Sequence, residues 1–360
     1  MSRSPNNVRI FVLITLACLV VAVIYTLSSA RTAKSSAVNL DSPPIGLPPS
    51  AAPIVPPAAP AAAQPHPERE GQVQARPYVI ALNVRDSPDM GKVEFSALDS
   101  IDDRTTTSLR CERIYFAADK GICLSREIKF FSAQTIATLV DVTFRPLFSV
   151  RTDGIPTRAR ISPDGRYAAF TVFVTGHSYA DAQLSTATLL VDIAKRATLA
   201  NLEEFDVLQD GSPVRSPDFN YWGVTFEHDS NFFYATLRTG GVNYLVHGDI
   251  KAKTVTVMYK GVECPSLSPD ETRIAFKKLI SRADWRVAVL NLTTLEETLL
   301  AETRSVDDQV EWLDNERLLY ALVDPAPWMS IMVVSADGSG QPNVFAKGAA
   351  SPAVVRQFQQ

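Results

Sequence analysis

The chain has 360 residues, of which 46% are hydrophobic and 21% are charged, and its formal net charge at neutral pH is −4. This composition is typical of a globular protein. The charge balance is slightly acidic and no stripe of basic residues runs along the sequence, so we expect no nucleic-acid partner.

An apolar segment lies near the N-terminus. Residues 10–27 carry no charge, and a run of this length is just enough for a helix to span a membrane, which needs ~20 residues. We therefore predict a transmembrane signal-anchor at 10–27, with residues 1–9 in the cytoplasm. A cleaved signal peptide is the alternative, because Ser28-Ser29-Ala30 offers small residues of the kind found at cleavage sites.

A segment rich in proline and alanine follows at residues 28–76. So many prolines prevent a helix or sheet, and the segment has little apolar surface to bury. Such linkers are semi-rigid spacers at about 3.1 Å per residue, so this one reaches on the order of 100 Å. We expect it to hold a folded domain away from the plasma membrane on the extracytoplasmic side, although a Pro-rich ligand for another protein is an alternative.

A repeated motif predicts the architecture of the remaining chain. The sequence SPDGRYAAF at residues 162–170 returns as SPDETRIAF at residues 268–276. In both copies Pro and Asp suit a tight turn, and a short apolar strand follows. Weaker copies contain Asp229 and Asp314, which lie 41 residues before and 44 residues after Asp270. A period in the low forties that carries short strands is typical of a propeller blade.

The period divides the chain into blades. Alternating residues predict strands at 78–84 and 92–98, and we expect five blades afterwards, at about 109–150, 155–205, 213–261, 262–304 and 305–348. The tail at 351–355 repeats the beginning of an innermost strand. We expect it to join the strands near 78–108 and complete a sixth blade, because closing the ring removes open sheet edges.

The repeated motif resembles that of TolB-like six-bladed β-propellers. The segment VECPSLSPDETRIAFKKL at residues 262–279 and the segment VDDQVEWLDNERLLY at 306–320 resemble the membrane-anchored TolB-like proteins of Gram-positive bacteria. The resemblance covers about residues 78 to 356 and implies an all-β, six-bladed propeller at 77–356. It also implies an envelope adaptor that binds an envelope or cell-wall-associated protein.

Three cysteines fall within the predicted propeller. Cys111 and Cys123 flank a predicted hairpin, and an extracytoplasmic location makes them a reasonable disulfide pair. The register of a turn at Asp119-Lys120 argues against the pair, because it places Phe116 opposite Cys123. We expect Cys264 to be a buried thiol. No second close pair of cysteines or histidines at ligand spacing indicates zinc.

In a propeller, the innermost strands of the blades surround a central channel. Residues just ahead of each innermost strand are expected to surround one mouth of the central channel, and their mixture of charge and aromatic character suits a binding face. The alternative is that they stabilise turns and form ion pairs between blades. The candidates are Arg158, Arg160, Asp218, Asn220, Tyr221, Trp222, Glu263, Asp307, Asp308 and Glu311.

Two functions fit these features. The first is a non-enzymatic interaction module without a cofactor, which is tethered to the membrane and binds a protein of the cell envelope. The alternative is a metal-dependent hydrolase in which Asp218, Glu263 and Asp308 hold a calcium-type cation, since hard cations bind clustered carboxylate oxygens.

Overall fold

The computed structural model describes residues 77–129, 132–176, 178–181, 183–281, 283–323 and 329–356. The expected membrane span at 10–27 and the linker that follows it lie outside these residues. In the part of the chain that is described, no helix combines the length and the apolar character that crossing a membrane requires.

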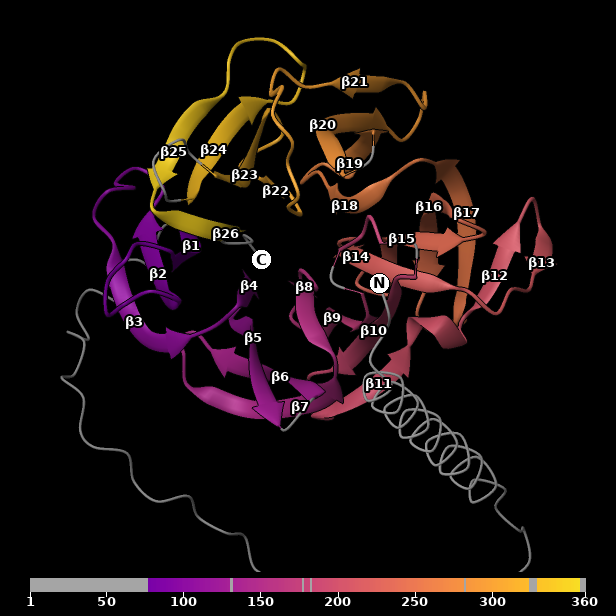
Figure 1. Cartoon of the computed structure of the whole chain (residues 1–360), viewed down its shortest axis with the longest axis horizontal. Coiled ribbons are helices and arrows are strands. Elements are labelled where there is room, and N and C mark those ends of the chain that lie inside the picture. The colour runs from indigo at the N-terminus through magenta and orange to yellow at the C-terminus, as the bar shows by residue number, and fades with distance from the viewer. Residues whose placement is uncertain are drawn as a thin grey trace, which may run out of the picture. The chain divides into compact units, whose positions relative to one another are not determined.

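The described strands form six sheets arranged as the blades of a β-propeller around a common centre (Figure 1). The expected all-β, six-bladed fold is therefore confirmed.

Five of the blades are formed by strands that follow one another in the sequence. Blade 1 contains β4 (Arg113–Ala117), β5 (Lys120–Lys129), β6 (Ser132–Asp141) and β7 (Pro146–Asp153). Blade 2 contains β8 (Ile155–Ile161), β9 (Tyr167–Thr175), β10 (Ser185–Asp192) and β11 (Ala197–Asn201). Blade 3 contains β14 (Asn220–Phe226), β15 (Phe232–Thr239), β16 (Val242–Asp249) and β17 (Thr254–Lys260). Blade 4 contains β18 (Glu263–Leu267), β19 (Arg273–Ser281), β20 (Asp284–Asn291) and β21 (Glu297–Leu299). Blade 5 contains β22 (Glu311–Trp312), β23 (Arg317–Val323), β24 (Met329–Ser335) and β25 (Asn343–Lys347).

Blade 6 closes the ring with strands from both ends of the propeller. Its sheet order is β26 (Ala349–Val355), β1 (Tyr78–Asn83), β2 (Lys92–Ala97) and β3 (Thr105–Arg110). Figure 1 shows the yellow β26 beside the indigo β1. The two strands pair antiparallel, with Val354 opposite Val79. The C-terminal strand therefore joins the N-terminal strands, as the repeated S-P start of its sequence predicted.

One hairpin adds to the regular pattern. After the 3₁₀ helix η1 (Leu202–Glu204), β12 (Asp206–Gln209) pairs parallel with the outermost strand of blade 3, and β13 (Ser212–Val214) pairs with β12. Blade 3 therefore belongs to a six-stranded sheet. The sequence did not predict this hairpin, because both strands are too short to show an alternating pattern.

The repeated turn has the same hydrogen bonds in both copies. The Ser162 hydroxyl donates to Asp164 at 2.7 Å, and it accepts from the backbone N–H of Tyr167 at 2.9 Å. Ser268 makes the equivalent bonds to Asp270 and Arg273 at 2.6 and 3.0 Å. The Ser and Asp side chains thus satisfy backbone groups that the turn leaves free, which explains why the motif recurs.

The core is divided among the blade interfaces. Within the described residues, six clusters of buried apolar side chains each join two neighbouring blades. The motif residues Ala168 and Phe170 belong to one such cluster, and Ala275 and Phe276 belong to two others. A small residue beside an aromatic one suits a strand that is covered on both faces, because the interior is closely packed.

The cysteines are arranged as follows. The structure joins Cys111 and Cys123 in a disulfide with their Cα atoms 5.5 Å apart. The register argument against this pair was wrong in detail, since Ile114 and not Phe116 lies opposite Cys123. Cys111 precedes β4 and lies outside the paired part of the hairpin, so strand register does not prevent the bridge. Cys264 is a buried free thiol.

Candidate functional site

The innermost strands run through the ring in the same direction, so they begin on one face and end on the other. We call these the start face and the end face. Among the described residues, a cavity of 260 Å³ opens where β4 and β8 begin, and Asp307 and the β9–β10 loop also line it. We call it the start cavity. A cavity of 170 Å³, the end cavity, lies where β4, β8 and β14 end.

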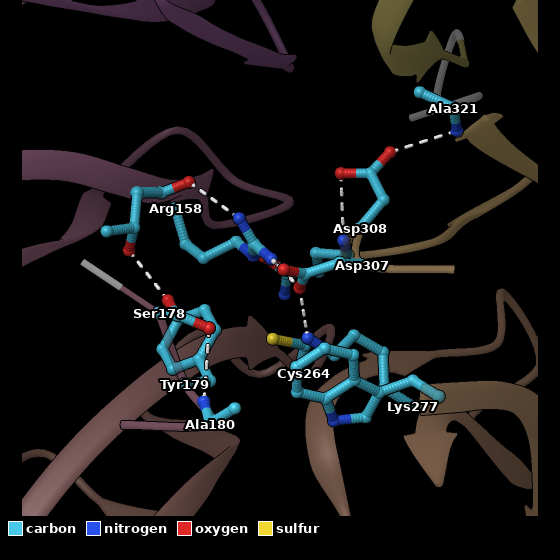
Figure 2. Close-up of polar contacts among 12 residues, drawn as sticks. Arg158, Ser178, Tyr179, Ala180, Cys264, Lys277, Asp307, Asp308 and Ala321 are labelled. Atoms are coloured by element: carbon cyan, nitrogen blue, oxygen red, sulfur yellow. Dashed lines mark hydrogen bonds and ion pairs between the residues drawn. The ribbon is translucent and has the colours of Figure 1, made fainter. Parts of the chain in front are cut away.

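Asp307 connects two cations at the start cavity. Its carboxylate lies 3.5 Å from the Arg158 guanidinium and is also paired with the ammonium of Lys277. Figure 2 shows the carboxylate between the two cations. The Asp307 side chain is 49% exposed, whereas that of Lys277 is 0% exposed. A buried ammonium ion therefore has a carboxylate partner that still contacts solvent.

The two cations control the protonation state of Asp307. Burial alone would raise the pKa of this carboxyl group, but the nearby positive charges of Lys277 and Arg158 outweigh burial and hold the pKa below its usual range. Asp307 is therefore ionised at neutral pH.

Tyr179 forms a wall of the start cavity. It comes from the β9–β10 loop, and its hydroxyl lies 2.7 Å from the Thr157 hydroxyl. Its ring stacks on Trp222 with the centroids 4.8 Å apart, and the Arg158 guanidinium lies 5.2 Å from the Tyr179 centroid. The loop thus places an aromatic ring between the channel cations and the buried aromatic cluster of blades 2 to 4.

Sequence reasoning missed three residues of this site. Arg113 begins the innermost strand β4 and lines the start cavity, and Tyr179 lies within the extra residues between β9 and β10. Both positions could have been found by applying the same geometric rule to blade 1 and to the long loop of blade 2. Lys277 gave no signal, because it stands in β19, which is not an innermost strand.

The structure separates the two predicted arginines of β8. Arg158 lines the start cavity, whereas Arg160 lines the end cavity. Residues two apart in a strand face the same side and are separated by about 6.6 Å along it, so both reach the channel at different depths. Arg160 lies 3.5 Å from Glu311 and 4.3 Å from the Tyr115 ring centroid.

Six predicted residues line neither cavity, namely Asp218, Asn220, Tyr221, Trp222, Glu263 and Asp308. Asp218 accepts hydrogen bonds from the Ser216 and Thr239 hydroxyls and from the Gly240 N–H, so it stabilises the β15–β16 hairpin. Asn220 accepts from the Thr186 N–H at 2.8 Å and connects blades 2 and 3. Trp222 is completely buried under Tyr179. The contacts of Asp218 and Asn220 are turn and inter-blade contacts, which are the kind that the alternative interpretation expected.

The predicted cation ligands also have separate roles. Asp308 accepts from the backbone N–H groups of Gln309 and Ala321 at 2.9 and 3.0 Å (Figure 2). Glu263 is 2% exposed, and burial raises the pKa of its carboxyl group. The described residues contain no group of three or more His, Cys, Asp or Glu side chains that could hold a metal ion. Asp218, Glu263 and Asp308, the predicted ligands of the hydrolase alternative, are therefore not brought together as such a group.

The comparisons with known proteins agree with this fold. No family model and no curated protein matches the sequence, but solved structures do. TolB from Acinetobacter baumannii is similar with a TM-score of 0.56 and 19% identity, over 77% of this chain and 67% of that chain. A putative TolB from Agrobacterium tumefaciens has a TM-score of 0.47 and 12% identity, over 76% and 89%. A puromycin-hydrolyzing peptidase from Mycobacterium tuberculosis has a TM-score of 0.45 and 13% identity, over 76% and 46%. The similarity to TolB from Acinetobacter baumannii agrees with the six-bladed propeller fold and does not establish an activity.

Proposed function

We propose that this chain is a non-enzymatic interaction module that binds a protein of the cell envelope with the start face of its propeller. One observation carries the proposal. Large apolar side chains are exposed on this face in several blades, around a cavity that is lined by charged and aromatic residues.

The apolar residues occupy equivalent positions. The second strand of each blade runs antiparallel to the innermost strand, so its C-terminal end lies on the start face. At or near these ends, five large apolar side chains are exposed, namely Ile128, Val174, Leu279, Ile280 and Val323. Ile128 is 73% exposed and Val323 is 65% exposed. Exposed apolar residues that recur on one face mark an interaction surface better than scattered ones do.

The composition of the face suits a protein partner. Interfaces combine apolar side chains with aromatic residues and arginine. Here Tyr179 and Arg158 lie at the start cavity, and the apolar residues lie at the ends of strands on the same face. A partner that covers this face would remove apolar surface from water, which contributes roughly 25 cal/mol per Å² of buried area before the costs of association.

We infer further that the propeller is held outside the plasma membrane. The apolar segment at 10–27 would serve as the anchor and the Pro/Ala segment at 28–76 as the spacer. The disulfide between Cys111 and Cys123 supports this location, because disulfides persist in oxidising compartments.

Crosslinking in intact cells tests the proposal. With a tag after Gln360, we expect one envelope protein to be recovered, and we expect an added protease to remove the tag without cell lysis. Val323→Lys should reduce recovery at least tenfold, whereas Val344→Lys should not. Val344 is the matched control, because its side chain is also exposed, at 44%, but it lies in the outermost strand β25. A protected tag would overturn the location, and equal recovery of both variants would overturn the binding face.

A further inference from the structure

Two arginines and two carboxylates line the start cavity, but only one of the carboxylates is paired with a cavity arginine. Arg113 and Arg158 both line it, together with the carboxylates of Asp307 and Glu112. The Glu112 carboxylate is paired at 3.2 Å with Arg126, which does not line the cavity. Asp307 is already shared between Arg158 and Lys277. The two cavity guanidiniums are thus left with a single carboxylate.

Arg113 is the cation without an acidic partner. Its Nε donates to the Thr157 carbonyl at 2.8 Å, and its Nη1 donates to the Glu112 carbonyl at 2.9 Å. Among the described residues, no carboxylate lies within ion-pair distance of its guanidinium. Burial and the positive charge of Arg158 lower the pKa of Arg113, and the negative charges of Asp308 and Asp307 act in the opposite direction.

Arg158 also has an unused donor. Its Nη1 donates to the Thr157 carbonyl at 3.0 Å and its Nη2 faces Asp307, but its buried Nε has no hydrogen-bond partner among the described residues. A buried donor without an acceptor is costly, so it marks a place where an incoming acceptor is favourable. Both arginines therefore offer N–H groups to the same cavity.

Further charged residues lie behind the cavity. Lys277 and Glu263 are both buried, and their charges have opposite sign. Asp308 accepts hydrogen bonds from two backbone N–H groups, and its negative charge also acts on Arg113 and Arg158. Within ion-pair distance, the two cavity guanidiniums have only Asp307 as a carboxylate partner among the described residues, so one further singly charged carboxylate would complete the pairing. The apolar side chains of Ile155 and Phe173 line the same cavity and suit an apolar residue next to the carboxylate.

We propose that the start cavity binds a carboxylate group of the partner protein between Arg113 and Arg158, with an apolar residue beside it. The proposal rests on the proposed function, in which the start face binds a protein. The carboxylate belongs either to an Asp or Glu side chain or to a chain terminus, and both present the same two oxygens to the guanidiniums.

Binding to short peptides tests this site with the full-length protein. The probes are four fluorescein-labelled peptides that share the sequence Ala-Val-Leu-Ala-Val-Leu. The first peptide ends in a free carboxylate, and the other three end in an amide. Of these three, one has no further change, one contains an internal Asp and one contains an internal phosphoserine. We expect the free acid or the Asp peptide to bind and the plain amide not to bind, and the stronger of the two identifies the source of the carboxylate. Binding of phosphoserine in preference to both carboxylates, or of no peptide, would overturn the proposal.

Charge substitutions on the same wall give the second readout. Arg113→Gln should weaken carboxylate binding about tenfold or more, because hydrogen bonds to a charged group are lost. Arg166→Gln, on the end face, is the matched control and should leave affinity unchanged. Glu112→Gln removes a negative charge from the lining and should tighten binding several-fold, which a folding defect cannot imitate. If the partner crosslinks at the start face and its affinity is the same for all three variants, the carboxylate site is wrong while the proposed function stands. If carboxylates bind and no partner crosslinks there, the site stands and the proposed function is wrong.

Discussion

The ammonium of Lys277 is completely buried in the channel, and the carboxylate of Asp307 is paired with it from the segment that leads into the next blade. The rings of Trp285 and Tyr179 lie 4.2 and 5.0 Å from the same ammonium. One ion pair thus connects blade 4 to the chain that enters blade 5, at the wall of the start cavity.

Removing this carboxylate should destabilise the propeller. Asp307→Asn removes the only carboxylate among the described residues that lies within ion-pair distance of the buried Lys277 ammonium. Breaking such a pair costs about 3 kcal/mol, at the low end of the usual range because Asp307 contacts solvent. Urea denaturation followed by tryptophan fluorescence measures the change. Asp206→Asn is the control, since Asp206 is exposed, and it should have no effect. Equal stability of the two variants would show that the pair contributes nothing.

The same pair predicts a pH dependence. The folded-state pKa of Asp307 lies below its ordinary value, so the folded protein binds this proton less tightly than the unfolded chain does. The stabilisation is therefore complete above about pH 4 and is lost as the pH falls through the lower folded-state pKa. The difference in unfolding free energy between wild type and Asp307→Asn should shrink over this acidic range. A constant difference down to pH 2 would contradict this assignment.

The channel contains a close backbone approach that requires glycine. Gly223 has a φ of +66°, and a Cβ there would lie 2.6 Å from the Cα of Cys264 in the next blade. Gly211 has a similar φ of +73° but open space around it. Gly223→Ala and Gly211→Ala share the cost of a left-handed backbone, about 1–2 kcal/mol. Gly223→Ala should lose at least about 1 kcal/mol more through overpacking. Equal losses of stability in the two variants would show that Gly223 and Cys264, in neighbouring blades, lie further apart than described.

The buried carboxyl group of Glu203 should make stability depend on pH with the opposite sign to that of Asp307. Burial raises the pKa of this carboxyl group to about 8, and both of its oxygens are shielded from solvent. The folded protein therefore holds this proton more tightly than the unfolded chain, and stability falls as the pH rises from about 4.5 to 8. Glu203→Gln should remove this slope and stabilise the protein at pH 8 by on the order of 3 kcal/mol. Glu204 is an exposed neighbour, so Glu204→Gln should keep the fall of stability with rising pH. If the stability of the wild-type protein did not fall over this pH range, the raised pKa of Glu203 would be wrong.

The disulfide should contribute to stability. Replacing Cys111 and Cys123 together by Ser opens a loop with a sequence separation of 12, and closing a loop of this size stabilises by roughly 3 kcal/mol. Denaturation midpoints of the double variant and the wild type measure this difference. Wild type treated with a reductant should match the double variant. No change on reduction would show that the bridge is absent in solution.

Much of the fold could be predicted from the sequence because it repeats. The Ser and Asp of the SPD motif make fixed local hydrogen bonds, so each copy forms the same turn and marks the same point in its blade. The S-P of the tail also predicted ring closure, although Ser351 lies within β26 and donates to the Ile114 carbonyl at 3.3 Å instead of forming the turn. The β12–β13 hairpin has no counterpart in other blades, so no repeat could indicate it.

The site was less predictable, because proximity in the sequence does not determine where a side chain points. Asp307 and Asp308 are neighbours, yet one faces Arg158 in the start cavity and the other binds backbone N–H groups. Asp218 turns back to its own hairpin. Lys277 reaches the channel from a second strand, which becomes apparent only when the blades are assembled.

The most direct test of the binding face is site-specific photocrosslinking in intact cells. A photoreactive amino acid would replace Val323 on the start face in one variant and Val344 on β25 in another. The account predicts a covalent adduct with one envelope protein from position 323 and none from position 344. An adduct formed only from position 344 would contradict the claim that the start face of the propeller binds the partner.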